Sequence, residues 1–326
     1  MMGEGNTPLV PSARTADLYF KLESANPSGS YKDRFVAAEI AALLARGVKA
    51  CVATSSGNTG SALAAYCARF DLRCAILVNV DAPEGKLAQM RAHGACVIRV
   101  PEFVTSAAVT ESVFAQLRAF TAAGAAALVV SAYRYCPIGM SGVESISREI
   151  AVQLPGVRHV FVPMGGGGLY SAVARGFASQ AVRPRVHVVQ PERCATILRG
   201  VVETVESTTR ISGLSVPFDI DASLALGLAR EHDGLLIGVA DEEVFAAQRT
   251  MLRDEGLYAE PAGAAALAGY RKALGAGLIG AHESAVCLVT GHGFKDPASI
   301  QSAIGEPPSP VVNSADVLRA LETMWT

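Results

Sequence analysis

The sequence predicts an α/β fold with open, parallel-rich sheets flanked by helices and divided between two domains. Short apolar runs alternate with longer amphipathic stretches along the chain, and this order predicts parallel strands joined by crossover helices. The 326 residues, half of them hydrophobic, suit two domains of ordinary size. No unit of about twenty to fifty residues recurs, so a solenoid or a propeller is not expected.

Eight apolar runs are the expected strands, because each is short and bounded by turn-forming residues. They are residues 18–22, 50–54, 74–78, 96–100, 128–131, 159–163, 186–190 and 285–290.

Stretches with helical apolar spacing lie between these runs and are the expected helices. They are residues 34–46, 58–70, 84–93, 104–122, 141–154, 168–179 and 241–255. A last helix is expected at 315–324, after a proline-rich loop at 305–310. Residues 199–233 have the weakest periodicity, and we expect them to cross the larger domain's surface or to line the mouth of the site.

Charge and cysteine usage limit the class of protein. The net charge is −2 and no basic block occurs, so neither nucleic acid nor a membrane surface is an expected partner. No apolar run reaches the roughly 18 residues that a membrane span needs. The seven cysteines form no CxxC pair, which favours reduced thiols and a cytoplasmic location.

Lysine is scarce, with six in the chain, and Lys32 has an unusual setting. It closes a turn-rich segment, residues 26–32 (Asn-Pro-Ser-Gly-Ser-Tyr-Lys), that follows a strand and opens into a helix. Desolvation and the helix dipole at such a position favour a neutral, nucleophilic amine. A solvated first-turn lysine would show the same local pattern.

Two further segments follow strands and begin helices. Residues 54–60 (Thr-Ser-Ser-Gly-Asn-Thr-Gly) offer hydroxyls and free backbone amides that suit a carboxylate, although they would also serve as a plain helix cap. Residues 163–169 contain four consecutive glycines. Such a loop can aim several amides at one phosphate, yet it is neither a P-loop nor a GxGxxG dinucleotide motif.

A fourth segment, residues 289–296 (Val-Thr-Gly-His-Gly-Phe-Lys-Asp), follows the last expected strand. Strand ends of this kind point into the crevice where open α/β sheets bind ligands, and Thr290 could meet a heteroaromatic nitrogen there. Alternatively, Thr290 only ends the strand. The histidines show no ligand spacing, so no metal site is expected.

Together, in this order and spacing, the segments resemble the fold-type II pyridoxal-phosphate (PLP) enzymes of the tryptophan synthase β superfamily, and within them most closely threonine synthase. The resemblance covers nearly the whole chain. It includes the opening residues 3–10 (Gly-Glu-Gly-Asn-Thr-Pro-Leu-Val) and residues 26–34. The glycine loop is more similar to that of serine and threonine dehydratases, and residues 56–60 are more similar to the loop of cysteine synthases.

The resemblance implies roles for residues in this sequence. Lys32 would hold the cofactor as a Schiff base and move protons at the substrate's α carbon and beyond. Thr290 would face the pyridine nitrogen, and Asn58 the phenolic oxygen. The two loops supply the other groups: the cofactor phosphate would lie on Gly165, Gly166, Gly167 and Gly168, and the substrate carboxylate on Ser55, Ser56, Asn58 and Thr59.

Arg134 aligns loosely with an arginine of threonine synthases, and there it could pair with a substrate phosphate; a surface salt bridge is the alternative. The family also implies a smaller domain of residues 33–138, a larger domain of residues 1–32 plus 139–326, and a homodimer. Closure of the smaller domain would exclude water.

A hydroxyl facing the ring nitrogen favours elimination and replacement over transamination. The first expectation is threonine synthase-like conversion of O-phosphohomoserine, a small amino-acid substrate. A serine/threonine dehydratase is the second, cysteine synthase-like β-replacement the third, and a non-catalytic amino-acid sensor belongs to another class. Lys32 argues against the sensor.

Overall fold

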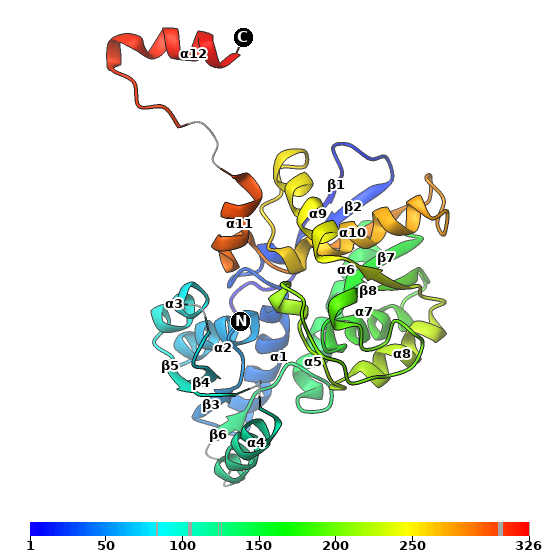
Figure 1. The fold of residues 1–326 in the computed structure, drawn as a ribbon. Coiled ribbons are helices and arrows are strands. Elements are labelled where there is room, and N and C mark those ends of the chain that lie inside the picture. The colour runs from blue at the N-terminus through cyan, green and yellow to red at the C-terminus, as the bar shows by residue number, and fades with distance from the viewer. Residues whose placement is uncertain (83, 104–105, 123, 125, 306–308, 326) are drawn as a thin grey trace.

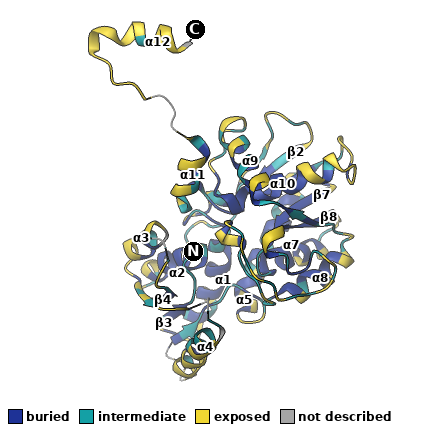
Figure 2. Cartoon of the chain, in the orientation of Figure 1, coloured by how far each residue is buried: buried dark blue, intermediate teal, exposed yellow. Residues whose placement is uncertain are grey.

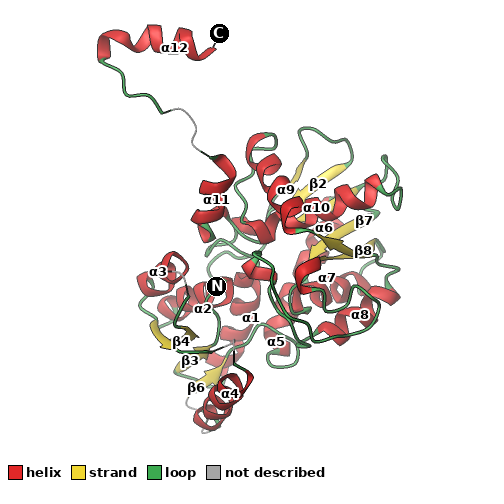
Figure 3. Ribbon diagram, in the orientation of Figure 1, coloured by secondary structure: helices red, strands yellow, loops and turns green. Residues whose placement is uncertain are grey.

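The strands form two separate sheets, one for each expected domain core (Figures 1 and 3). The structure is a computed structural model that describes residues 1–326 except 83, 104–105, 123, 125, 306–308 and 326. In the smaller sheet all strands are parallel, in the order β5-β4-β3-β6. Its strands are β3 (Ala50–Ala53), β4 (Arg73–Asn79), β5 (Cys96–Val100) and β6 (Ala126–Leu128).

The larger sheet has the order β1-β2-β10-β7-β8-β9 and is parallel except for the β1–β2 pair. Its strands are β1 (Leu9–Pro11), β2 (Leu18–Lys21), β7 (His159–Pro163), β8 (Arg185–Pro191), β9 (Leu236–Val239) and β10 (Ala285–Leu288). The predicted α/β class with parallel-rich sheets is therefore confirmed. Every parallel neighbour sends its carboxyl end to the same sheet edge, where the loops that follow β7 and β10 lie.

Helices cover both sheets. Those with the smaller sheet and the region between the sheets are α1 (Lys32–Ala45), α2 (Asn58–Arg69), α3 (Glu84–Ala92), α4 (Ala107–Thr121) and α5 (Pro137–Val143). The others are α6 (Ser145–Gln153), which packs on α7, α7 (Gly168–Ala178), α8 (Ala222–Glu231), α9 (Asp241–Arg253), α10 (Pro261–Gly275), α11 (Pro297–Ile304) and α12 (Val317–Trp325). In the described part of the chain, no helix is long and apolar enough to cross a membrane.

One hydrophobic core joins the two sheets. It includes Phe35 of α1 and Tyr66 of α2, together with Val160 of β7 and Phe177 of α7, all fully buried. A second cluster lies under α9 and α10. Figure 2 shows the buried interior against the exposed outer helices, with α12 standing apart from the body.

A buried polar network fixes the N-terminal segment to the helices. Arg34 binds Glu23 with two hydrogen bonds of 2.7 Å and also binds both carboxylate oxygens of Glu149. The ammonium of Lys21, which is fully buried, lies 2.6 Å from Glu149. These four charged groups join β2 and η1 (Glu23–Ala25) to α1 and α6.

Two boundary predictions were wrong, and two strands were not predicted. The strand expected at 128–131 lies at Ala126–Leu128 instead, because the chain turns after Val129, where the Ala132 amide donates to the Val130 carbonyl. The helix expected at 141–154 is two helices, since Pro137 takes the first position of α5 and the chain changes helix at Glu144. The three-residue strand β1 and the edge strand β9 were not predicted.

Other expectations are confirmed or fall on undescribed residues. The final helix, expected at 315–324, is α12. The helix expected at 104–122 is α4, but residues 104–105 lie outside the described residues, as do 306–308 of the loop expected at 305–310. Residues 199–233 contain η3 (Ser212–Leu214) and α8, and part of this stretch contacts the glycine loop.

Candidate active site

The turn before Lys32 is held in place from both sides. The amide and the hydroxyl of Ser28 donate to the carboxylate of Asp33, at 2.9 and 2.6 Å. The amide of Tyr31 donates to the carbonyl of Thr290 at 3.1 Å, which ties the turn to the end of β10. Lys32 therefore begins α1 with its backbone fixed beside the carboxyl edge of the larger sheet.

The Lys32 side chain is half-buried, and its amine is held by neighbouring groups of the site. Its Nζ donates a hydrogen bond to the hydroxyl of Ser131 at 2.7 Å and lies 4.5 Å from the centre of the Tyr31 ring. Burial lowers the pKa of Lys32 to about 7, although the negative charges of Asp221 and Glu260 favour its ammonium form. A large share of this amine is therefore neutral near pH 7, as a nucleophile or a general base requires.

Asn58 begins α2 at the carboxyl end of β3, and its side-chain amide donates to Glu260 at 2.7 Å. No side chain caps this helix at Gly57, so the first amides of α2 remain available to a ligand. Ser55 and Ser56 are half-buried in the loop before the helix, and Thr59 is buried in its first turn.

The glycine loop joins β7 to α7. Gly167 has φ +100°, and a Cβ there would lie 2.5 Å from the carbonyl oxygen of Asp221, so only glycine fits without strain. Within the described part of the chain, Gly165, Gly166, Gly167 and Gly168 donate no backbone hydrogen bond. Free amides at a helix N-terminus are the donors that bind a phosphate group.

Asp221 connects this loop to the turn that follows Ser131. Its amide donates to the carbonyl of Gly166 at 2.9 Å. Its carboxylate accepts from the amides of Tyr133 and Arg134, at 2.7 and 3.2 Å. Burial raises the pKa of Asp221, against those hydrogen bonds.

Thr290 is 4% exposed, and its hydroxyl makes no hydrogen bond with another described side chain. Glu260 lies beside it: the Glu260 amide donates to the carbonyl of Gly291 at 3.1 Å, and a Cβ at Gly291 would collide with the Glu260 carboxylate. The structure thus gathers Lys32, Asn58 and Glu260 around the end of β10.

Arg134 is exposed, with its guanidinium carbon 6.0 Å from the ring of Tyr135. Burial disfavours the charged form of Asp219, but hydrogen bonds from Ser223 and the nearby charge of Arg134 lower the pKa of that carboxyl. The structure places Arg134 one turn away from Ser131 and gives its side chain an acidic neighbour.

Sequence reasoning missed two residues of this site. Ser131 was expected only as the last residue of a strand, and Asp221 lies in the stretch with the weakest periodicity. Glu260 was noted as a first-turn acid, but its contact with Asn58 joins residues 202 positions apart. No local pattern signals a contact between such distant segments.

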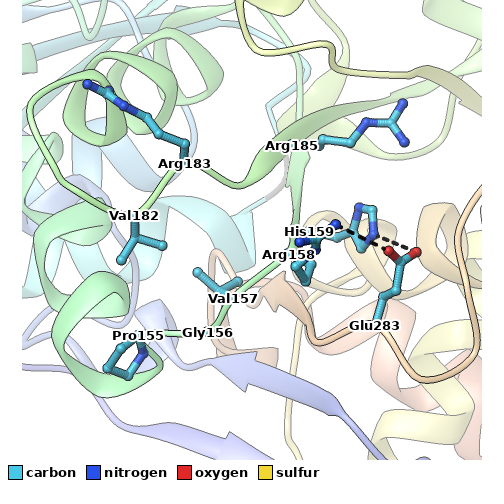
Figure 4. A pocket seen from close by; sticks show the side chains of 9 residues that line it. All are labelled: Pro155, Gly156, Val157, Arg158, His159, Val182, Arg183, Arg185 and Glu283. Atoms are coloured by element: carbon cyan, nitrogen blue, oxygen red, sulfur yellow. Dashed lines mark hydrogen bonds and ion pairs between the residues drawn. The ribbon is translucent and has the colours of Figure 1, made fainter.

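A cavity of about 460 Å³ lies elsewhere, at the opposite ends of the same strands (Figure 4). His159 at the start of β7 faces Glu283 at 3.2 Å and His187 at 3.0 Å. Arg183 and Arg185 line this cavity too, but their side chains point in different directions. The cavity contains no lysine and no glycine loop, and it is separate from the candidate active site.

Comparison with known proteins identifies the enzyme family to which the chain belongs. A family described as pyridoxal-phosphate dependent enzyme matches residues 1–291. The threonine synthase of Bacillus sp. (strain ULM1) is 33% identical over 310 residues, which cover 90% of this chain and 84% of that protein. The threonine synthase of Halalkalibacterium halodurans is 32% identical over 332 residues, covering 96% and 89%.

A solved structure of maize serine racemase superposes with a TM-score of 0.77 at 23% identity, covering 98% of this chain and 92% of that chain. The chain therefore belongs to the pyridoxal-phosphate-dependent enzymes, has their fold-type II architecture, and uses pyridoxal phosphate as its cofactor.

The site fits this cofactor in three ways. A partly neutral amine stands at Lys32 for the aldehyde, the free amides of the glycine loop suit the phosphate, and the Thr290 hydroxyl lacks another described partner. In the described residues, no group of three or more His, Cys, Asp or Glu side chains is arranged to hold a metal ion.

Proposed function

We propose that this enzyme carries out elimination and replacement on a small phosphorylated L-amino acid, as in the conversion of O-phosphohomoserine to threonine. The observation that carries the proposal is the Lys32 amine, whose pKa burial lowers to about 7 and whose partner Ser131 borders the glycine loop. The threonine synthase relatives, which match over nine-tenths of the chain, supply the substrate class.

In this proposal Lys32 would hold the cofactor as a Schiff base, and the amides of Gly165, Gly166, Gly167 and Gly168 would hold its phosphate. Asn58, oriented by Glu260, would bind its phenolic oxygen, and Thr290 would face its ring nitrogen. Bound pyridoxal phosphate supplies an electron sink for negative charge at the substrate's α carbon.

The substrate is held by its two ends. Its carboxylate lies on Ser55, Ser56 and the open N-terminus of α2, at Asn58 and Thr59, where amides and the helix dipole favour an anion. Arg134 meets the phosphate by moving its exposed side chain away from Tyr135. The Lys32 amine takes the proton from the α carbon and returns protons later in the reaction.

A dehydratase is the second candidate, and two observations favour it. The glycine loop has four consecutive glycines, as in the dehydratase-like pattern, and Arg134 has an acidic neighbour, Asp219, that competes for its charge. In that case the substrate carries no phosphate and the products are a 2-oxo acid and ammonia.

We further propose a homodimer in the cytoplasm, with no nucleic-acid partner. The seven free cysteines, five of them buried, suit a reducing compartment, and the net charge near zero suits a protein without a nucleic-acid partner; the homodimer is carried over from the family alone. Residues 33–138 act as the smaller domain, which closes over the substrate and excludes water from Lys32.

Product analysis tests the proposed reaction. The purified enzyme is incubated separately with O-phosphohomoserine, L-threonine, L-serine and O-acetylserine, with Lys32→Ala as the control. We expect phosphate and threonine from the first substrate and nothing from the control. A 2-oxo acid and ammonia from threonine or serine, without turnover of O-phosphohomoserine, would establish the dehydratase instead.

A further inference from the structure

Ser131 is the hydrogen-bond partner that the described part of the chain gives to the Lys32 amine, at 2.7 Å. Ser131 follows β6, far from Lys32 in sequence, and among the described residues its hydroxyl otherwise makes one long contact, 3.7 Å, with the sulfur of Met140. The hydroxyl thus caps no backbone group of the described residues.

Ser131 also borders the glycine loop. A Cβ at Gly168 would lie 3.3 Å from the Ser131 carbonyl oxygen. The residue thus stands between the amine and the first turn of α7. No other serine or threonine hydroxyl in the described part of the chain contacts the Lys32 amine.

The turn that presents Ser131 is fixed by one carboxylate. Asp221, 4% exposed, accepts from the amides of Tyr133 and Arg134 and binds the glycine loop through its own amide. Its negative charge also favours the ammonium form of Lys32. Asp221 therefore sets the distance between the Ser131 hydroxyl, the glycine loop and the lysine.

We propose that Ser131 is a catalytic residue that holds the Lys32 amine whenever this amine is free, and that Asp221 is the residue that positions Ser131. This inference rests on the proposed role of Lys32. When the Nζ lone pair takes a proton from the substrate's α carbon, the electron pair of the C–H bond stays with the substrate. The new ammonium then donates to the Ser131 oxygen, which stabilises the charge.

The direction of the effect follows from this contact. Removing the hydroxyl removes a hydrogen bond made to the charged form of Lys32, so the ammonium becomes less stable and its pKa falls further. A hydrogen bond to a charged group has an effect of about one pKa unit or more, which is about a tenfold change in the ratio of amine to ammonium. A serine that only fills space would leave this pKa unchanged.

The test uses the full-length chain freed of cofactor. The chain is acetylated briefly with acetic anhydride at evenly spaced pH values between about 5 and 10. Mass spectrometry then measures the fraction of Lys32 that is acetylated at each pH. The variants are Ser131→Ala, Ser131→Thr and Asp221→Asn. Lys272, whose side chain is 40% exposed, is the internal control in every sample.

We expect the Lys32 profile to move to lower pH by about one unit in Ser131→Ala and in the same direction in Asp221→Asn. Ser131→Thr retains the hydroxyl and should keep the original profile, and Lys272 should not shift. If Ser131→Ala did not fold, Ser131→Cys, a weaker acceptor, should shift in the same direction. Coincident profiles for Ser131→Ala and the unmodified chain, or an equal shift in Ser131→Thr, would overturn the inference.

In the loaded enzyme, Ser131→Ala should lower kcat with little change in KM, and Ser131→Thr should restore most of it. A failure of this inference can be distinguished from a failure of the proposed function. If added pyridoxal phosphate gave no visible absorbance band, the role of Lys32 would be contradicted, whereas the acetylation shift would still report on Ser131.

Discussion

In the proposed reaction the Lys32 amine transfers protons, and its protonation changes near neutral pH. Burial lowers its pKa to about 7, and the charges of Asp221 and Glu260 limit the shift. Below that pH the amine holds its proton and cannot act as a base; above it the lone pair is free. The burial of Lys32 therefore determines the pH at which the proposed reaction can proceed.

We therefore expect kcat to fall about tenfold per pH unit below about pH 7, and to reach a plateau above it. Steady-state rates with saturating substrate between about pH 5 and 9 measure this. Asp221→Asn, which removes a charge that favours the ammonium, should move the fall in kcat to lower pH. If kcat fell over the same pH range in this variant, Lys32 would not be the group whose protonation controls the rate.

The elements that carry the site follow from local sequence, and their assembly does not. The glycine loop and the start of α2 were predicted because glycine, serine and asparagine between an apolar run and a helix have a local signature. The proposed role of Ser131 could not be predicted, because it depends on the turn that follows β6 and on a carboxylate at Asp221, 90 residues later. The edge strand β9 pairs with β8 alone. Its four residues are therefore a weak sequence signal for a strand.

The glycine loop offers a matched pair of substitutions. Gly167→Ala should lower the free energy of unfolding by about 2–4 kcal/mol and weaken cofactor binding, because its φ is positive and a Cβ would meet the Asp221 carbonyl. Gly275→Ala, at a helix end with open space around it, should be neutral or stabilise by about 0.5–1 kcal/mol. Urea unfolding measures both. Equal effects would show that the loop is not constrained as described.

The network between β2, α1 and α6 should stabilise the chain in a pH-dependent way. Burial opposes the charged form of Glu149, but hydrogen bonds from Arg34 and Lys21 lower its pKa to about 2. A depressed carboxyl pKa means that this stabilisation is present above about pH 4.5 and is lost as the pH falls towards 2.

Glu149→Gln should therefore lower the free energy of unfolding by about 3 kcal/mol at pH 7, because it leaves buried Arg34 and Lys21 without their shared partner. Its deficit should shrink as the pH falls below about 4.5. Glu84→Gln, which breaks only exposed pairs with Arg91 and Arg99, should cost less than about 1 kcal/mol. Similar deficits in the two variants would contradict the account of the network.

At the scale of the whole molecule, the Gln89 side chain links α3 to Lys295 and to the turn before Lys32. The Lys295 amine donates to the Gln89 oxygen, and the Gln89 amide donates to the carbonyl of Ser28 at 3.1 Å. Burial lowers the pKa of Lys295, against the charges of Glu260 and Asp33. These contacts join the region of the smaller sheet to the turn that presents Lys32.

Lys295→Met and Gln89→Ala should both lower kcat/KM by about tenfold while changing the free energy of unfolding little, because they favour an open arrangement of the proposed domains. Lys272→Met, which removes only exposed ion pairs, is the matched control and should leave kcat/KM unchanged. Steady-state kinetics and urea unfolding of the three variants provide the comparison. A normal kcat/KM in both site variants would show that these contacts do not contribute to closure.

The measurement that tests the central claim most directly is borohydride reduction of the purified enzyme loaded with pyridoxal phosphate, followed by peptide mapping. The chain has six lysines, of which Lys21 is engaged with Glu149 and Lys295 with Gln89. We predict that the visible absorbance band disappears on reduction and that the cofactor is then found on Lys32. Attachment to Lys295 or another lysine, or absence of attachment to any, would contradict the account.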